Sequence, residues 1–502
     1  MREKRFVRPS VDGPNILEKT VFQGFNLPAE FYHKVGFYRS SWGGLRTAIL
    51  RLSRRPSNTI FLLVSQRIDA LICPRWTIPV EPEVAVREDL CLAIHNGRIL
   101  ALVSRSDALE LYSPDAIHER PDHVLLPGLV NAHTHAAMTL MRGYGEDMSL
   151  ERWLNERIWP TEVRLMGSDF VADGVRLAIS EMLLGGITCF ADMYFYPERA
   201  SEIAAESGIR MVVGMIAIEF PTPWAADAAE CISKGLAVHD FYRTQPLIST
   251  MFAPHAPYTV SDTTLKRIRQ LADELEVPVQ MHIHETAKVV EDALAEDGRR
   301  PLERLETLGL LTPALMAVHA TQLTPGDVAT LAEAGCSVVH CPRSNLKLVS
   351  GACPVADLVD AGVNVSLGTD GAAANNRLDL WSEMNTAALF GKFVAADPAV
   401  LPAGTIIELA TLNGARALGL EAEIGSLLEG KSADAICVDL RNPGTRPVLD
   451  PLSQLVYAAG RENVTDVWVA GEHLVKGGGL ARMDVGAILQ KADEWAEKIT
   501  AS

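Results

Sequence analysis

Two histidines separated by one residue, His133 and His135, offer the first chemistry in this 502-residue sequence. They follow an apolar run, 124–130, which is typical of a buried β-strand. On a strand, residues i and i+2 point to the same face, so both imidazoles can face one ion. Neutral imidazoles are common zinc ligands, and this pair would supply half of a four-ligand site. The pattern alone is weak, and its value depends on whether the chain supplies the missing ligands.

A second pair of histidines ends the apolar segment 277–283 and extends just past it. If the strand continues, His282 and His284 share a face, so that one can bind the metal while the other supports it. Glu285 comes next, and a glutamate beside an activated water is a natural proton carrier. The alternative for Glu285 is a solvated carboxylate that caps the following helix.

Other polar groups also follow apolar segments. Asp370 comes after the segment 363–368, in a Gly-Thr-Asp-Gly stretch that begins and ends with glycine. It is either a turn residue or a metal ligand. Together, His133, His135, His282 and Asp370 would offer three nitrogens and one oxygen. This set suits Zn²⁺ and leaves a position for water. Three further histidines end predicted strands: His255, His319 and His340.

The elements that must position these groups alternate along the middle of the chain, 126–424. Eight apolar strand candidates are separated by helical stretches, such as Ser261 to Leu275 with Ser261 as its N-cap. Repeated βα units in this number predict a (β/α)₈ TIM-like barrel, whose catalytic groups lie at the carboxyl ends of the strands. A doubly wound open sheet is the alternative, but no Gly-x-Gly-x-x-Gly or P-loop pattern follows any strand. The candidates are 124–130, 187–193, 209–218, 247–253, 277–283, 315–319, 336–341 and 363–368.

Short β-like runs flank this region on both sides. Residues 65–125 and 425–485 are predicted to form one small β-sandwich domain from both ends of the chain, and 486–502 a C-terminal helix. The remaining segment, 1–64, is a basic extension: its first 58 residues contain 11 Lys and Arg against 4 Asp and Glu. We expect it to be poorly ordered.

Composition limits the classes of partner and compartment. A net charge of −17 argues against a nucleic-acid partner, and no apolar run reaches the roughly 20 residues that cross a bilayer. The eight cysteines form no Cys-x-x-Cys pair and lie mostly in apolar segments, so buried reduced thiols and a cytoplasmic location are expected, with disulfides as the alternative. The expected partner is a small molecule, and a homo-oligomer is left open.

These residues together resemble the amidohydrolase superfamily over about 65–480. The resemblance rests on the stretch from Pro127 to His135, on His282 with Glu285, on His319, and on Gly368-Thr369-Asp370. Within it, the chain is similar to the branch that contains 5′-methylthioadenosine/S-adenosylhomocysteine deaminases and s-triazine hydrolases. That closer similarity lies in three stretches, His133 to Gly143, Ala253 to Tyr258, and Cys341 to Leu348.

The resemblance implies roles for particular residues. One Zn²⁺ per subunit would be held by His133, His135, His282 and Asp370, and the same ligands also accept Fe²⁺, Mn²⁺ or Ni²⁺. Catalysis would use Glu285, His319 and Asp370. The substrate would contact Trp153, Glu162, His255, Glu285 and Asp370. Binuclear members carry a carboxylated lysine at the end of strand four, where this chain has His255, so one metal is implied.

The implied reaction is hydrolysis of the exocyclic C–N bond of an adenine nucleoside. The product of the favoured substrate, 5′-methylthioadenosine, would be 5′-methylthioinosine with release of ammonia. Relatives that take S-adenosylhomocysteine carry an arginine after strand three, and residues 218–227 contain none, which favours the apolar methylthio group. S-adenosylhomocysteine and adenosine are the other candidates. A hydrolase of guanine, another purine or an s-triazine is the first alternative, and a non-enzymatic binding protein on this scaffold is the second.

Overall fold

The computed structural model describes residues 49–53, 59–63 and 65–501. β1 (Ile49–Ser53) and β2 (Thr59–Leu63) form an antiparallel pair, which belongs to the first of two units of the chain. The second unit, 68–108 and 114–502, contains the remaining sheets. Apart from these two strands, the predicted extension 1–64 lies outside the described residues. The predicted boundaries of the other domains stay a prediction.

Eight parallel strands form the sheet that positions the site. Their order in the sheet follows their order in the chain. At the carboxyl end of the last strand, the backbone N–H of Thr369 donates to Asn131 Oδ1 (3.0 Å) and that of Asp370 to the carbonyl of His133 (3.1 Å), which links the last strand to the first. The predicted barrel is therefore confirmed. Its strands are β8 (Leu129–Thr134), β9 (Ile187–Asp192), β10 (Arg210–Ala217), β11 (Ile248–Pro254), β12 (Val279–Ile283), β13 (Leu315–His319), β14 (Ser337–His340) and β15 (Asn364–Leu367).

The first barrel strand begins later than the predicted run 124–130. Residues up to Pro127 belong to β7 (Tyr112–Pro127) of the other sheet, and β8 begins at Leu129. Gly128 lies between the two strands, where an added Cβ would come within 2.0 Å of the Thr188 hydroxyl oxygen. Both strands are buried and apolar at this point, so hydrophobic periodicity cannot reveal the change of sheet.

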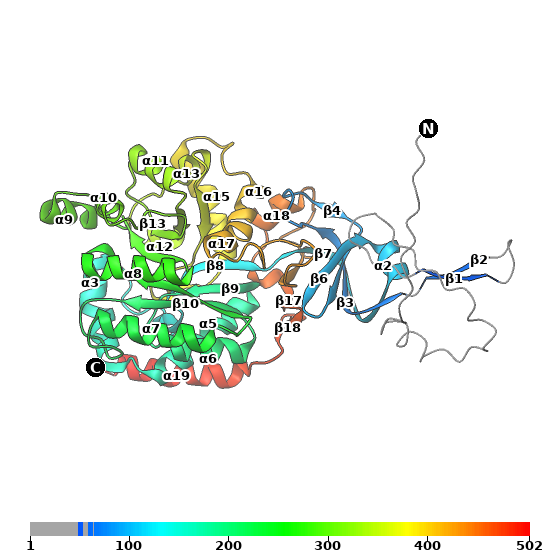
Figure 1. The fold of residues 1–502 in the computed structure, drawn as a ribbon, viewed down its shortest axis with the longest axis horizontal. Helices are drawn as coiled ribbons and strands as arrows, with labels where there is room; N and C mark the ends of the chain where they lie inside the picture. The colour runs from blue at the N-terminus through cyan, green and yellow to red at the C-terminus, as the bar shows by residue number, and fades with distance from the viewer. Residues whose placement is uncertain (1–48, 54–58, 64, 502) are drawn as a thin grey trace, which may run out of the picture. The chain divides into compact units, whose positions relative to one another are not determined.

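Helices follow the barrel strands and cover the outside of the sheet (Figure 1). α8 begins at Asp262, and the Ser261 hydroxyl accepts from the Thr264 backbone N–H (3.3 Å), which confirms the predicted N-cap. No helix in the described part of the chain is long and apolar enough to span a membrane. The helices between the strands are α3 (Leu150–Trp153), the π-helical turn η3 (Leu154–Ile158), α4 (Trp159–Leu165), α5 (Ser168–Leu184), α6 (Pro197–Ser207), α7 (Ala228–Tyr242), α8 (Asp262–Leu275), α9 (Ala287–Asp297), α10 (Pro301–Thr307), α11 (Pro325–Ala334), α12 (Pro342–Lys347), and α13 (Val355–Asp360).

After β15 the chain forms further helices, of which the last returns to the barrel wall. α19 (Val485–Thr500) lies alongside α5 (Figure 1). Trp495 contacts the Phe170 ring at 5.3 Å, and its indole N–H donates to Asp173 (2.9 Å). The other helices in this part are α14 (Ala372–Asn375), α15 (Leu380–Ala395), α16 (Ala403–Leu409), α17 (Leu412–Ala417) and α18 (Pro451–Tyr457).

A second sheet is built from residues on both sides of the barrel region, as predicted. Its order is β19-β18-β17-β16-β7-β3-β5-β6, with β4 paired to β3. Asn96 and Gly97 make the turn between β5 and β6, and both have positive φ (51° and 73°), as the Asn-Gly pair predicts. The strands are β3 (Gln66–Thr77), β4 (Arg87–Glu88), β5 (Leu90–His95), β6 (Arg98–Ser104), β16 (Ala435–Asp439), β17 (Val464–Val469), β18 (Glu472–Lys476) and β19 (Gly479–Leu480).

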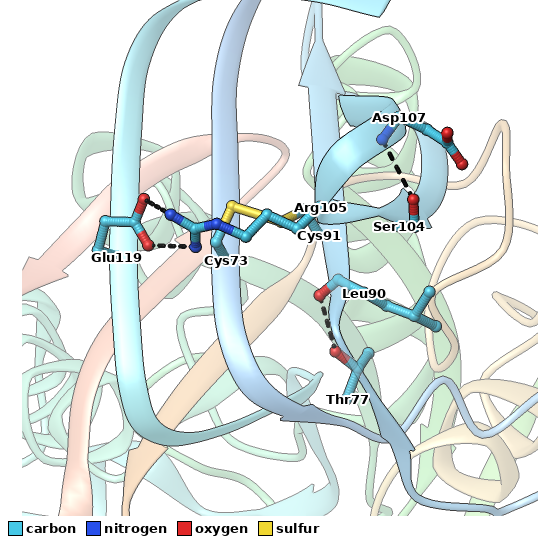
Figure 2. The surroundings of a disulfide bond; sticks show 8 residues. All are labelled: Cys73, Thr77, Leu90, Cys91, Ser104, Arg105, Asp107 and Glu119. Carbon is cyan, nitrogen blue, oxygen red and sulfur yellow. Dashed lines mark hydrogen bonds and ion pairs between the residues drawn. A yellow bond between two sulfur atoms is a disulfide. The ribbon is translucent and has the colours of Figure 1, made fainter. Parts of the chain in front are cut away.

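Cys73 on β3 and Cys91 on β5 form a disulfide across neighbouring strands, with their Cα atoms 4.4 Å apart (Figure 2). The expectation of reduced thiols is therefore wrong for these two residues. The pairing depends on strand register, which a separation of 18 residues does not reveal. Nearby, Arg105 and Glu119 form a two-point ion pair (Figure 2). The other six cysteines are free and buried.

A buried ion pair joins the barrel to the second sheet. Arg210, the first residue of β10, donates two hydrogen bonds to the Asp434 carboxylate (3.1 and 3.2 Å). Asp434 also accepts from the backbone N–H of Ala470, the residue that follows β17 of the second sheet (2.8 Å). Because both side chains are buried, removing one of them leaves the other charge without a partner.

Replacing Asp434 by alanine should therefore lower the free energy of unfolding by about 3–5 kcal/mol. Chemical denaturation monitored by circular dichroism measures this change. The control is Asp292→Ala, which removes the exposed i,i+4 partner of Lys288 (2.9 Å) and should cost less than about 1 kcal/mol. Equal effects of the two substitutions would contradict a structural role for the Arg210–Asp434 pair.

Candidate active site

Three histidines meet at the carboxyl ends of the barrel strands. His133 lies in β8, His135 directly follows that strand, and His282 lies in β12. Their candidate ligand nitrogens all lie within 4.8 Å of one another. The strand pairing brings together residues almost 150 positions apart, and the group of three can hold a metal ion.

The hydrogen bonds behind these imidazoles fix which nitrogen is free. Each Nδ1 lies at hydrogen-bond distance from a carbonyl oxygen, namely the Gln280 side chain for His133 (2.7 Å), the Met193 backbone for His135 (2.6 Å) and the His255 backbone for His282 (2.8 Å). A carbonyl only accepts, so each Nδ1 carries the proton and each Nε2 keeps a lone pair. This is the donor set that a borderline cation such as Zn²⁺ requires.

Burial keeps two of these imidazoles, His133 and His282, neutral. Burial, reinforced by the neighbouring His135, lowers the pKa of His133 to about 3. Burial also lowers the pKa of His282 well below its usual value. The Nε2 atoms of His133 and His282 are 3.3 Å apart, a separation at which two lone pairs repel unless a cation accepts them. The donors thus fit a metal ion chemically.

Asp370 extends this cluster from the end of β15. Its Oδ1 lies 3.3 Å from His135 Nε2 and 3.8 Å from His133 Nε2. Its Oδ2 accepts a hydrogen bond from the Ser344 hydroxyl (2.6 Å). Burial favours the neutral acid, yet the neighbouring imidazoles, His135 foremost, hold the pKa of Asp370 below its usual value. The carboxylate can therefore bind a cation or accept a proton.

Glu285 and His319 lie beside the same cluster. His319 stacks on the His282 ring at 5.4 Å, and its Nε2 lies 3.8 Å from Glu285 Oε1. The other ring nitrogen of His319 is 2.9 Å from the side-chain oxygen of Asn345. Burial raises the pKa of the Glu285 carboxyl, which the nearby His319 opposes. A carboxyl that is easily protonated and a fixed imidazole are suited to proton transfer.

Two of these residues have a backbone conformation that L-residues rarely adopt. The φ angles of His319 and Asp370 are 72° and 60°. Such conformations cost about 1–3 kcal/mol each and persist where the surrounding structure enforces them, often at functional sites. His319 is the last residue of β13 and Asp370 lies three residues past β15, and both side chains reach the mouth of the barrel.

His284 does not join the cluster, so the expected common face of His282 and His284 is wrong. β12 ends at Ile283, and His284 has a φ of 51°, which interrupts the alternation. Its Nε2 instead accepts from the backbone N–H of Leu302 in α10 (3.2 Å). His340 is also buried behind the site and does not line the cavity.

A cavity of about 430 Å³ opens over the cluster. The predicted substrate-contacting residues Trp153, Glu162 and His255 all line it, together with Glu285 and Asp370. Apolar side chains make up most of the wall, and among the described residues no lysine or arginine lines it. Of the residues implied for metal binding, catalysis or substrate binding, His133 alone does not line the cavity.

Three residues close to the site received no role from the sequence. Gln280 orients His133, Ser344 binds Asp370, and Tyr194 lines the cavity and donates to Glu162 (2.6 Å). Gln280 could have been found, because it precedes His282 by two residues on one strand and shares its face. The other two lie past the ends of strands, where periodicity gives no direction.

Comparison with known proteins agrees with this geometry. The sequence matches the Amidohydrolase family over residues 124–474. The chain belongs to this family. A 5-methylthioadenosine/S-adenosylhomocysteine deaminase of Teredinibacter turnerae is 48% identical over 434 residues, which cover 86% of this chain and 98% of that protein. A protein of the same name from Saccharophagus degradans is 46% identical, over 86% of this chain and 97% of its own length.

Solved structures of amidohydrolase-like enzymes share the architecture. An adenosine deaminase of Xanthomonas campestris with bound zinc has a TM-score of 0.87 and 48% identity, covering 88% of this chain and all of the other. The zinc complex of an atrazine chlorohydrolase from Arthrobacter aurescens has a TM-score of 0.79 at 23% identity, which shows the common fold. This member of the amidohydrolase family is accordingly a metal-binding hydrolase that cleaves C–N bonds.

Proposed function

We propose that this amidohydrolase deaminates adenine nucleosides by hydrolysis, with 5′-methylthioadenosine as its main substrate. The observation that carries the proposal is the composition of the cavity. One end holds the histidine cluster with Glu285, His319 and Asp370, while the wall adds Glu162 and many apolar side chains. Relatives named for this substrate match nearly their whole length to this chain, which supports the same conclusion.

The proposed metal is one Zn²⁺, held by His133, His135, His282 and Asp370. When bound, it would supply a Lewis acid that activates water as a nucleophile near neutral pH. The lone pairs left on the three Nε2 atoms and the lowered pKa of Asp370 support this assignment. The zinc in the Xanthomonas campestris structure also supports it.

The proposed proton transfers use the remaining polar groups of the site. Asp370, with His319 beside it, accepts a proton from the attacking water. Glu285 donates a proton to ring nitrogen N1 of adenine, which makes carbon C6 more electrophilic. Asp370 then passes its proton to the amino group, the C6–N bond breaks and ammonia leaves. The hydroxyl on C6 returns a proton to Glu285 and becomes the carbonyl of the product. The 3.8 Å approach of Glu285 to His319 supports exchange of protons between them.

The nucleoside would be oriented by Trp153, Glu162 and His255. Burial lowers the pKa of His255 to about 4, and its Nδ1 is 3.0 Å from the Thr259 hydroxyl. His255 is therefore a neutral, oriented imidazole beside the cluster. Glu162 presents a carboxyl group that can accept from the ribose hydroxyls, and Trp153 adds an aromatic surface to the same wall.

The cavity wall, as far as the structure describes it, contains no lysine or arginine, and this distinguishes the candidate substrates. The segment after β10 places Ile218, Phe220 and Pro221 on the cavity wall. An apolar methylthio group can pack there, whereas the carboxylate of S-adenosylhomocysteine would lose water without gaining a charged partner. We therefore expect kcat/KM for 5′-methylthioadenosine to exceed that for S-adenosylhomocysteine by about tenfold or more, measured by ammonia release.

A matched pair of variants tests the physical reason. Phe220→Arg places a cation in this segment and should shift the ratio of kcat/KM values toward S-adenosylhomocysteine by about tenfold. Phe220→Leu keeps the wall apolar and should leave the ratio near its original value. If both variants move the ratio equally, charge is not the deciding factor.

The same substrate panel separates the alternatives. Guanine, adenosine and an s-triazine serve as competitors, and faster turnover of one of them would replace the proposed substrate. A protein without ammonia release from any of them, and without bound metal after purification, would be a binding protein on this scaffold. A role in purine salvage, a cytoplasmic location and a homo-oligomeric state stay predictions.

A further inference from the structure

Tyr194 lines the cavity, but the proposed reaction gives it no task. It follows β9 by two residues and is buried, with its ring held edge-on against Phe195 (5.5 Å between centroids). Its hydroxyl donates to Glu162 Oε1 over 2.6 Å, a distance typical of a strong bond to a carboxylate. The bond joins the end of a barrel strand to α4, an element beyond the barrel sheet.

Glu162 depends on this bond. Among the described residues, no other group donates a hydrogen bond to its side chain. The residue is only 9% exposed and borders the cavity, so water can replace a lost donor only from that side. The second carboxylate oxygen, Oε2, has no protein partner in this part of the chain and keeps its lone pairs for a ligand.

The direction of the bond is fixed by the chemistry of the pair. Burial, with the nearby Glu162 adding to it, raises the pKa of the Tyr194 phenol well above its usual value, so the phenol remains the donor. Burial raises the pKa of Glu162 to about 7, while the Tyr194 hydrogen bond acts in the opposite direction. Tyr194 thus favours the accepting form of Glu162.

We infer that Tyr194 is a positioning residue that holds Glu162 as the acceptor for a vicinal diol, and that the pair selects ribonucleosides over deoxynucleosides. One lone pair of Oε1 is taken by the phenol. The other lone pair of Oε1 and those of Oε2 remain for two adjacent hydroxyl groups, which matches the 2′- and 3′-hydroxyls of ribose. This inference rests on the proposed function and deepens it by naming the sugar that the site requires.

Tyr194→Phe removes one oxygen atom and tests the inference directly. The probes are 5′-methylthioadenosine and its 2′,3′-dideoxy analogue. We expect kcat/KM for the diol substrate to fall about tenfold, mainly through KM, because a hydrogen bond to a charged group is lost. The dideoxy analogue cannot use the acceptor, so its kcat/KM should change less than about twofold. The preference for the diol should therefore fall about tenfold.

A double substitution shows whether Tyr194 acts through Glu162. Glu162→Gln should weaken the preference by itself, and adding Tyr194→Phe should then cause little further loss. Tyr196→Phe is the matched control, because Tyr196 lies two residues after Tyr194. Its hydroxyl donates to the backbone carbonyl of Pro223 (3.0 Å). This control should keep the preference for the diol.

Two outcomes would overturn the inference while leaving the proposed function intact. One is an equal loss on both nucleosides in Tyr194→Phe, which would indicate general damage to the cavity. The other is an unchanged preference. Failure of the unsubstituted enzyme to release ammonia from any adenine nucleoside would instead overturn the proposed function.

Discussion

Glu285→Gln should lower kcat for 5′-methylthioadenosine by roughly 10³-fold, the usual scale of a general acid–base residue. Glutamine has nearly the same shape but carries no transferable proton. The site would keep its metal-binding histidines, none of which hydrogen-bonds to Glu285 among the described residues. Steady-state kinetics combined with metal analysis by mass spectrometry measure both effects on one preparation.

The informative result is the combination of full metal content with lost turnover. A variant that loses both would show that Glu285 supports the metal site. A variant with kcat near that of the unsubstituted enzyme would remove Glu285 from the mechanism. Glu219→Gln is a suitable control, because Glu219 follows β10 at the same end of the barrel and binds Ser261 and Thr264 outside the cavity lining.

His282→Ala should abolish both metal binding and activity. The substitution removes one of three imidazoles whose nitrogens lie within 4.8 Å of one another. The two remaining imidazoles and the Asp370 carboxylate should hold a divalent ion more weakly, because one of the four proposed donors is lost. Metal content after dialysis should fall from about one per chain to a small fraction of that.

His284→Ala provides a control that only the structure could suggest. His284 is two residues from His282, but its ring accepts from Leu302 and lies away from the cluster. The variant should keep its metal and most of its activity, although it loses a hydrogen bond worth about 1 kcal/mol to stability. Loss of metal in this variant would mean that His284, as the alternation first suggested, belongs to the site.

Much of the architecture follows from the sequence because strand ends carry a strong signal. The apolar runs located seven barrel strands to within about two residues, and most of these runs lead directly into a histidine or an aspartate. The alternation rule succeeded for His133 in β8 and for His135, which follows the strand directly and keeps a negative φ of −124°. It failed for His284, where the strand had already ended and a positive φ reversed the side chain.

Features that depend on long-range packing could not be predicted. The Cys73–Cys91 disulfide needs the register of β3 against β5, and the change of sheet at Gly128 joins two apolar strands without any change of pattern. The hydrogen bond from Tyr194 to Glu162 connects a strand end with a helix that follows a π-helical turn. None of these three features produces a periodic pattern in the nearby sequence from which it could be predicted.

Gly128 also determines how far the effect of a bound metal extends. With a single residue between β7 and β8, the second sheet and the strand of His133 share one continuous backbone. The N–H of Gly128 donates to the carbonyl of Asp434, which comes from the other end of the chain (3.0 Å). We therefore expect the two sheets to unfold together. An ion that binds only the folded protein raises the free energy of unfolding of both sheets. The apo and metal-bound proteins should therefore differ in stability as well as in activity.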